Sequence, residues 1–215
     1  NPVEMIRKVA HLYPKSHFTR IDGSIAKQLG TEFLIRHDRD MDDYVYDINE
    51  LRDLAGKKYD GKRNLIKNFE SYNPKICQLD ESKIGLFTEF QQHWCRKNNC
   101  VSKPDLLAEN LAIEELLYNL KTMKVFGVCI LINDRVEGFS IGEPQNDTTI
   151  VEHFEKANTE FKGIYQYLLN SFVKAFPPQY TFLNREQDLG IPGLRKSKLS
   201  YHPAQMIEKY SARLI

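Results

Sequence analysis

The chain has 215 residues, 41% of them hydrophobic, which is enough to bury one core or somewhat more. A formal net charge of +1 argues against a strongly basic nucleic-acid-binding protein but is compatible with a local basic face. No apolar run approaches the roughly 20 residues that a membrane-spanning helix needs, and no signal-peptide pattern opens the chain. We therefore expect no transmembrane segment and a cytoplasmic protein.

The first forty residues predict a small mixed segment. Apolar spacing indicates a helix at "VEMIRKVAHLY" (3–13) and a smaller one near Ile25, with strands near Phe18 and at "EFLIR" (32–36). The polar run "HDRDMDD" (37–43) predicts a boundary after residue 42. The preceding segment is too small to be a domain alone.

The next segment predicts one strand and several helices. "DYVYD" (43–47) is typical of a strand, "INELRDLAG" of a helix that Gly56 ends, and "KKYDGKRNLIKNFESY" of a basic helix. Two more helices are expected at about 82–121, the first capped by Ser82. The second has apolar residues spaced i, i+3, i+4 and i+7, at Ile113, Leu116, Leu117 and Leu120.

Three strands then follow without an intervening helix, at 123–132, 136–142 and 148–154, with Asn133-Asp134 as the first tight turn. A long helix ends before Pro177-Pro178. Its apolar residues keep the helical period over four turns: Phe161, Ile164, Tyr165, Leu168, Leu169, Phe172, Val173 and Phe176. The remaining elements are a strand at "QYTFL", a short helix at "GLRKSKLSY" after Pro192, and a last strand at "QMIEKYSARL".

The four cysteines, at positions 77, 95, 100 and 129, form no CxxC pair. His93 lies near Cys95 and Cys100, but the spacing fits no common zinc pattern. We expect structural or incidental thiols in a reducing setting, and no metal site.

The order of elements from residue 43 resembles the GNAT acyltransferase fold with a helical insertion. This is an α+β fold with a mixed, mostly antiparallel central sheet flanked by helices. Three motifs add a more specific resemblance: "DYVYD", "GKKYDGKRNLIKNF" and "NREQDLGIPGLRKSKLSYHP". With them the chain resembles a soluble bacterial branch of the phosphatidylglycerol lysyltransferase C-terminal-domain family.

This resemblance implies a GNAT-like fold, often present as two copies in tandem, and a relation to Fem-type enzymes that take an aminoacyl group from tRNA. Residues 1–42 would be the remnant or tail of a first GNAT-like unit. Residues 43–215 would be a GNAT-like domain with the insertion at about 82–121. The membrane helices of the lipid-modifying enzymes are missing, and no catalytic residue of the lysyltransferase is carried over to this sequence.

A coenzyme A-dependent enzyme of this fold needs a phosphate cradle, usually glycine-rich, where the long helix begins. The corresponding stretch, "EKANTEFKGIYQ", has a single glycine, Gly163. Glu155 and Glu160 would repel pyrophosphate, and Lys156 and Lys162 only partly offset them. The sequence thus disfavours ordinary coenzyme A binding.

The basic helix is a candidate for binding tRNA or another phosphate, because its cations lie within a few turns and Tyr59 could stack on a base. A solvated helix face is the alternative. The candidate residues are Lys57, Lys58, Lys62, Arg63 and Asn64, with Lys67 one turn further on.

The residues that follow "TFL" are the candidate reaction site, because in this fold strand ends splay there around donor and acceptor. Glu186 or Asp188 could accept a proton from an incoming amine, and Tyr201 could protonate the leaving group. The substrate-binding candidates are Asn184, Arg185, Arg195, Lys196 and Lys198.

A purely structural loop is the alternative for this stretch. Asp188 to Gly190 could then form only a turn, and Arg195 could pair with Glu186. We expect His202 to be a capping or surface residue and His153 to end its strand.

The sequence therefore predicts a transferase that moves an aminoacyl group from aminoacyl-tRNA to an amine or hydroxyl of a small-molecule, peptide or lipid acceptor. Two alternatives stay open. One is an N-acyltransferase that uses acetyl- or acyl-coenzyme A, and the other is an inactive GNAT-like binding module.

Overall fold

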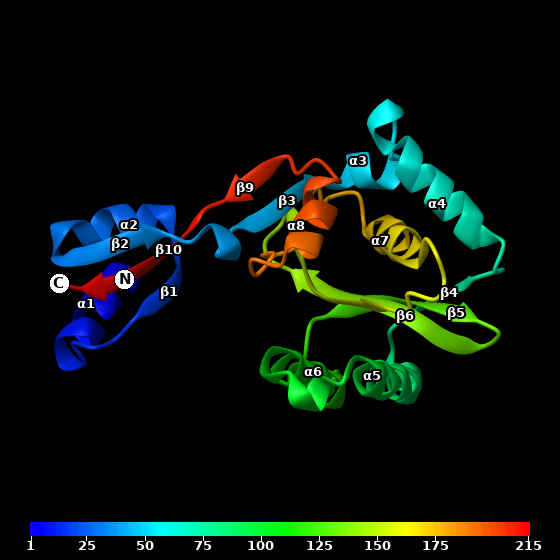
Figure 1. Cartoon of the computed structure of the whole chain (residues 1–215), viewed down its shortest axis with the longest axis horizontal. Helices are drawn as coiled ribbons and strands as arrows, with labels where there is room; N and C mark the ends of the chain where they lie inside the picture. Colours follow the sequence, from blue (N-terminus) through cyan, green and yellow to red (C-terminus); the bar gives the residue numbers. More distant parts are fainter. The chain divides into compact units, whose positions relative to one another are not determined.

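A computed structural model describes all residues from Asn1 to Ile215 and divides the chain into two compact units (Figure 1). The first unit comprises Asn1–Tyr46 and Asn184–Ile215, and the second comprises Asp47–Leu183. The expected α+β class is confirmed. The assignment of 1–42 and 43–215 to two GNAT-like copies concerns their origin and stays a prediction.

One part of the first unit is a three-stranded antiparallel sheet covered by two helices. The C-terminal strand β10 (Lys209–Leu214) lies between β1 (Phe18–Asp22) and β2 (Phe33–His37). Ala212 is paired with Phe18 on one side and with Ile35 on the other. Helices α1 (Pro2–Leu12) and α2 (Gly23–Leu29) bury the residues of a small core: Val3, Ala10, Ile21, Ala26, Leu29, Phe33 and Ala212.

The rest of this unit is built on β3 (Asp43–Asp47), which is antiparallel to β9 (Gln205–Ile207). The chain at 184–186 runs along the other edge of β3. There the Arg185 amide donates to the Tyr44 carbonyl (2.9 Å), and the Tyr44 amide donates to the Glu186 carbonyl (3.2 Å). Helix α8 (Pro192–Leu199) begins with proline at its first position, as expected.

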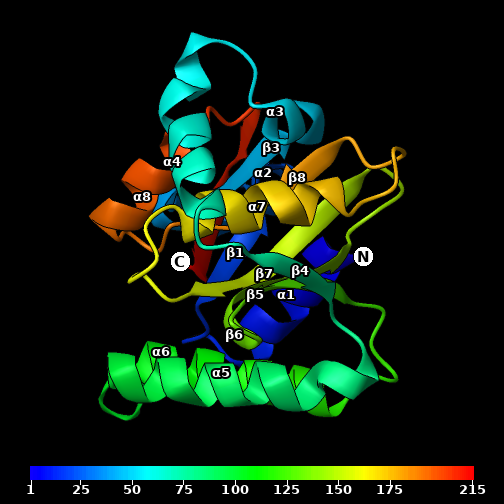
Figure 2. The same cartoon turned by 90° about the vertical axis from the view of Figure 1, so that its right-hand side faces the viewer.

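The second unit is a sheet with helices on both faces (Figures 1 and 2). Its strands lie in the order β4 (Lys75–Gln78), β5 (Phe126–Ile132), β6 (Arg135–Pro144), β7 (Thr149–Ala157) and β8 (Phe182–Asn184). Helices α5 (Ile84–Asn98) and α6 (Pro104–Tyr118) cover one face. Helices α3 (Ile48–Asp53), α4 (Asp60–Glu70) and α7 (Ile164–Lys174) lie on the other side.

Each face of this sheet has its own apolar layer. On the α5–α6 side, Phe87 and Phe90 pack against Phe139 of β6. On the α7 side, Phe126 of β5 packs against Phe172, 5.8 Å away between ring centroids. The sheet is thus buried on both faces, which explains why the first of the three predicted strands is an almost continuous apolar run.

Several local predictions were wrong. The predicted last strand at 205–214 is two strands, β9 and β10, in different sheets, and the long helix predicted over 161–176 is limited to Ile164–Lys174. Helix α3 ends at Leu54, which takes a left-handed conformation (φ 48°), two residues before the predicted stop at Gly56. Ser82 does not cap α5. Its amide donates instead to the Asp80 side chain in a preceding 3₁₀ turn. The edge strand β4 was not predicted.

The cysteines are not thiols. Cys77 and Cys129 are directly opposite each other on β4 and β5 and form a disulfide, with 5.2 Å between their Cα atoms. Cys95 and Cys100 form a second disulfide at the end of α5.

None of the helices combines the length and the apolar character that crossing a membrane requires.

Candidate functional site

All candidate reaction-site residues from Asn184 to Tyr201 belong to the first unit, and Asp188 is at the centre of their contacts. Its carboxylate is fully buried. Arg195 donates to both of its oxygens at 2.8 Å, and the Tyr44 hydroxyl donates to Oδ2 at 2.5 Å. The Gly190 amide donates to Oδ1 at 2.9 Å, and Arg39 donates to Oδ2 at 3.4 Å.

These donors determine the charge of the cluster. Burial alone would raise the pKa of Asp188, but the hydrogen bonds from Arg195 and Tyr44 outweigh it and hold that pKa well below its usual value. The bonds to Asp188 and Asp40 raise the pKa of Arg195 further. Asp188 is therefore ionised and saturated with donors, which suits a residue that positions its neighbours.

Asn184 and Lys198 hold the backbone of the same loop. Asn184, which is 2% exposed, accepts from the Glu186 amide (2.8 Å) and donates to Asp43 (3.2 Å). The buried ammonium of Lys198 donates to the carbonyl oxygens of three consecutive residues, Arg185, Glu186 and Gln187. One lysine thus stabilises three consecutive loop carbonyls, of which that of Glu186 also accepts from the Tyr44 amide.

Glu186 differs from its neighbours in backbone and exposure. Its φ of 52° is unusual for a residue with a side chain, and such conformations concentrate at functional sites. The residue is half-buried, whereas Tyr201 is only 4% exposed. The Tyr201 ring packs edge-on against Tyr46 and beneath the guanidinium of Arg185. The predicted pairing of Arg195 with Glu186 is wrong, because Arg195 pairs with Asp188 and Asp40.

A groove of about 530 Å³ lies at the beginning of α8. Arg195 and the exposed Lys196 line it, and Gly190, Pro192, Leu199 and Ser200 complete the wall. Both cations are available to an anion on this surface, although Arg195 is also held by Asp188.

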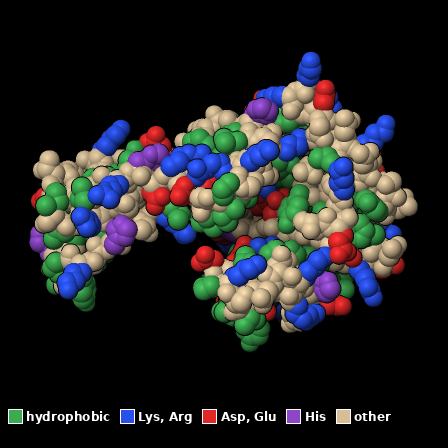
Figure 3. Space-filling view, in the orientation of Figure 1, with side chains coloured by type: hydrophobic (Ala, Val, Ile, Leu, Met, Phe, Trp, Pro, Cys, Tyr) green, Lys and Arg blue, Asp and Glu red, His purple; other side chains and the backbone are tan.

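The basic segment belongs to the second unit, and several of its groups have partners within the chain. Lys58 pairs with Glu50 at 2.7 Å, and Arg63 donates to the carbonyls of Leu54 and Gly56. Figure 3 shows Lys and Arg side chains projecting at separate points in the region of α4 rather than as one continuous patch. Lys57, Lys58, Arg63, Asn64 and Lys67 are exposed and Lys62 is half-buried.

Tyr59 does not offer its ring to a base. It is 1% exposed, and its hydroxyl donates to Glu50 at 3.0 Å. Burial, together with this bond, raises its pKa well above the usual value.

The start of α7 is packed against α4. Gly163 has φ 95°, and a Cβ atom placed there would lie 2.3 Å from the Leu65 carbonyl oxygen. Of the two lysines that the sequence places here, Lys162 is exposed, whereas Lys156 faces α5 and α6 and is paired with Glu109. Glu160, in the loop before α7, is paired with Lys97. Lys156 also lies 4.3 Å from the centre of the Trp94 ring.

Sequence reasoning did not assign roles to a polar group on the α7 side of the sheet. Ser140 of β6 donates to the buried carboxylate of Glu152 on β7 at 2.6 Å. Burial, together with the charge of Glu155, raises the pKa of Tyr165 on α7 to about 12. The signal available in the sequence was the presence of Glu152 within the strand predicted at 148–154.

The fold and these contacts can be compared with known proteins. The family model described as "Phosphatidylglycerol lysyltransferase, C-terminal" matches residues 9–213. The chain belongs to this family. The resemblance seen in the three motifs is therefore confirmed, and it extends into the N-terminal forty residues.

Other members and structures agree with this assignment. A conserved protein of unknown function from Bacteroides thetaiotaomicron VPI-5482 is 31% identical, with a TM-score of 0.91 over 100% of this chain and 76% of that one. L-PGS from Bacillus licheniformis is 15% identical, with a TM-score of 0.67 over 98% of this chain and 71% of that one. The latter likeness concerns the fold alone.

An uncharacterised protein of Mycoplasmoides gallisepticum is 26% identical over 181 residues, which are 80% of this chain and 56% of that protein. The chain thus spans little more than half the length of this curated relative. Family and fold together support a lysyltransferase-like or GNAT-like transferase.

Proposed function

We propose that this domain transfers an aminoacyl group from aminoacyl-tRNA to an amine or hydroxyl acceptor. The observation that carries the proposal is the start of α7, which is occupied by the chain's own groups. Gly163 lies against the Leu65 carbonyl of α4, and Glu160 in the loop before it is paired with Lys97. A pyrophosphate bound there would have to displace these contacts. Family membership then favours an aminoacyl donor over coenzyme A.

The reaction forms one bond and breaks one. The acceptor nitrogen or oxygen attacks the ester carbonyl carbon, and the bond from that carbon to the ribose oxygen of the tRNA breaks. The acceptor loses a proton, and the ribose oxygen gains one. An amine is mostly protonated at pH 7, so a carboxylate that accepts its proton accelerates the attack.

We assign the proton-accepting role to Glu186 and the proton-donating role to Tyr201. Glu186 is the half-buried carboxylate of the loop, and its backbone is held by Asn184, Lys198 and β3. Asp188 acts as a positioning residue, because its oxygens are already saturated with donors.

The cations would bind the anionic parts of the donor. Arg185, Arg195 and Lys196 are suited to phosphate or carboxylate groups, whereas Lys198 is committed to the loop carbonyls. In the second unit the exposed groups around α4 would add non-specific attraction for tRNA phosphates, which weakens as salt rises. The acceptor is a small molecule, peptide or lipid.

The test uses aminoacyl-tRNA labelled in its amino acid, incubated with the full chain and a set of amine and hydroxyl acceptors. We expect label to move from tRNA to an acceptor. Glu186→Gln should slow this transfer by about a hundredfold or more. Glu208→Gln, which changes an exposed glutamate bonded to Tyr210, should leave it unchanged.

Three outcomes would overturn the proposal. The first is neither binding of aminoacyl-tRNA nor loss of its label. The second is tight binding of acetyl-coenzyme A with acetyl transfer, which would identify a coenzyme A-dependent enzyme. The third is binding of aminoacyl-tRNA without turnover that Glu186→Gln and Tyr201→Phe leave unchanged, as in a binding module.

A further inference from the structure

The inserted helices α5 and α6 line a cavity that is open to solvent and that the proposed reaction does not use. Its volume is about 380 Å³, near the lower end of the range for small-molecule sites. Its wall comes from α5, α6 and the turn that joins them. The lining residues are Gln92, Cys95, Arg96, Asn99, Cys100, Val101, Asn110 and Glu114.

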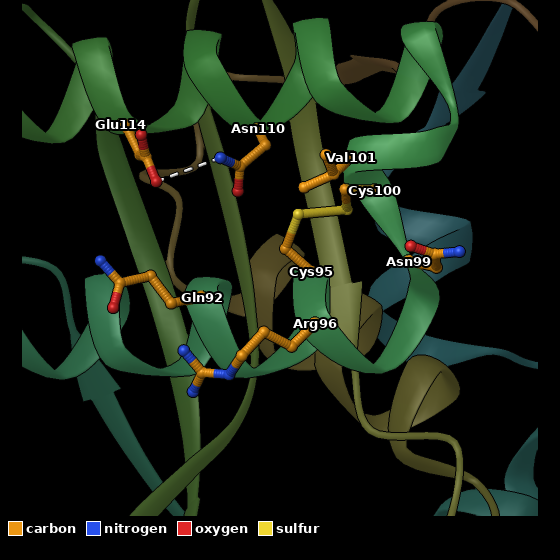
Figure 4. Close-up of a pocket in the computed structure, with 8 residues that line it drawn as sticks. All are labelled: Gln92, Cys95, Arg96, Asn99, Cys100, Val101, Asn110 and Glu114. Carbon is orange, nitrogen blue, oxygen red and sulfur yellow. Dashed lines mark hydrogen bonds between the residues drawn. A yellow bond between two sulfur atoms is a disulfide. The ribbon is translucent and has the colours of Figure 1, made fainter.

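The cavity has a polar side and an apolar side (Figure 4). The polar ends of Gln92 and Arg96 on α5 and of Glu114 on α6 lie on one side. The Cys95–Cys100 disulfide and Val101 lie toward the other. A ligand that fits this wall therefore has a charged or polar end and an apolar end.

Hydrogen bonds between buried side-chain amides connect the core to the polar side of the cavity. Gln91, which is 1% exposed, donates through Nε2 to Asn110 Oδ1 at 3.1 Å. Asn110, which is 8% exposed, in turn donates to Glu114 Oε1 at 3.1 Å. These bonds hold Asn110 and orient the Glu114 carboxylate along the cavity wall.

Two opposite charges on this wall remain without ionic partners. The Arg96 guanidinium makes no ion pair, and Glu114 makes none either, its recorded contact being the neutral amide of Asn110. The two groups do not pair with each other, although they line the same cavity. A ligand with a carboxylate and an ammonium would pair with both.

We propose that this cavity binds a small zwitterion, namely a free α-amino acid with an apolar side chain. Arg96 binds the carboxylate and Glu114 the ammonium, while the side chain lies against the disulfide and Val101. The volume of about 380 Å³ accommodates one amino acid such as leucine. The site lies wholly within the insertion, and the inference is independent of the aminoacyl-transfer proposal.

The experiment is a titration of the isotope-labelled full chain, followed by nuclear magnetic resonance of its backbone amides. The probes are L-leucine, its methyl ester and N-acetyl-L-leucine. The ester lacks the carboxylate, and the acetyl derivative lacks the ammonium. We expect leucine to shift amides of α5 and α6 with a dissociation constant in the millimolar range, and each derivative to bind at least tenfold more weakly.

Variants test the two charges separately. Glu114→Gln and Arg96→Met should each raise the dissociation constant of leucine at least tenfold. Glu115→Gln is the matched control. Glu115 is the next residue on the same helix, exposed and bonded to Asn119 outside the cavity. The unbound spectra of the variants show directly whether each one is folded.

The proposal is overturned if leucine produces no saturable shifts in α5 and α6, or if the three probes bind equally. It is also overturned if Glu115→Gln weakens binding as much as Glu114→Gln. Failure of aminoacyl transfer alone would leave these binding results unchanged, so the two proposals fail separately.

Discussion

Replacing Asp188 by asparagine tests whether the charge of this residue organises the loop. Asparagine has nearly the same shape but a single side-chain oxygen. When the asparagine is oriented so that its oxygen takes the place of Oδ2, this oxygen keeps the three hydrogen bonds of Oδ2, from Tyr44, Arg195 and Arg39. The amide nitrogen of asparagine then takes the place of Oδ1, which in the native protein accepts hydrogen bonds from the second Arg195 nitrogen and from the Gly190 amide. A nitrogen that is itself a donor cannot accept these two bonds.

Two lost bonds, each worth about 1.5 kcal/mol at a charged group, give a loss of about 3 kcal/mol in the free energy of unfolding. This agrees with the roughly 3–5 kcal/mol found when one partner of a buried ion pair is removed. Arg195 keeps Asp40 and is itself 34% exposed, so we expect the lower end of that range. At a urea m-value of about 2 kcal/mol/M, the unfolding midpoint falls by about 1.5 M.

The assay is urea unfolding followed by far-ultraviolet circular dichroism at pH 7, with Asp40→Asn as the control. Asp40 contacts the same guanidinium but its side chain is 54% exposed, so its replacement should cost less than about 1 kcal/mol. The reasoning is refuted if Asp188→Asn lies within 1 kcal/mol of the native protein, or if both variants lose the same amount.

The remaining predictions concern pH, the loop lysine and one glycine. Because folding lowers the pKa of Asp188, its contribution to the free energy of unfolding is complete above the unfolded pKa of 3.8 and is lost progressively as pH falls below it. The difference in this free energy between the native protein and Asp188→Asn should therefore shrink in urea titrations from pH 5 to pH 3. Lys198→Met removes the ammonium that donates to three loop carbonyls, of which that of Glu186 keeps another donor, the Tyr44 amide. The variant should speed amide hydrogen exchange at 185–189 at least tenfold, and unchanged exchange would contradict the assigned role. Gly163→Ala should lower the melting temperature by several degrees, since the new Cβ meets the Leu65 carbonyl, whereas Gly61→Ala inside α4 meets open space and should raise it slightly. Equal shifts for the two glycine variants in calorimetry would rule out the steric argument.

Helix α7 and the three strands before it could be predicted because their signals are local. The helix, predicted over 161–176 and found at Ile164–Lys174, shows its apolar period without a distant partner. The same holds for the two strands that Asn133 and Asp134 separate. Both turn residues have positive φ, as this kind of tight turn requires. The family resemblance was likewise present in three short motifs and is confirmed by the match to residues 9–213.

Strand β4 was missed because it has no pattern of its own. It is a four-residue edge strand that is mostly exposed, and it exists because β5 pairs with it and Cys77 is joined to Cys129. The Cys77–Cys129 pair was missed for the same reason, since residues 52 positions apart in the sequence give no sign that they lie opposite each other.

The sequence by itself determined the α+β class, the family and the concentration of charged residues at 184–202. Only the tertiary structure decided what those charges do. Tyr44 reaches Asp188 across 144 residues of sequence, and Lys198 turns inward to three carbonyls while Lys196, two residues earlier, stays exposed. Local patterns follow from the geometry of neighbouring residues, whereas the burial and pairing of a charge depend on which distant groups the folded chain brings beside it.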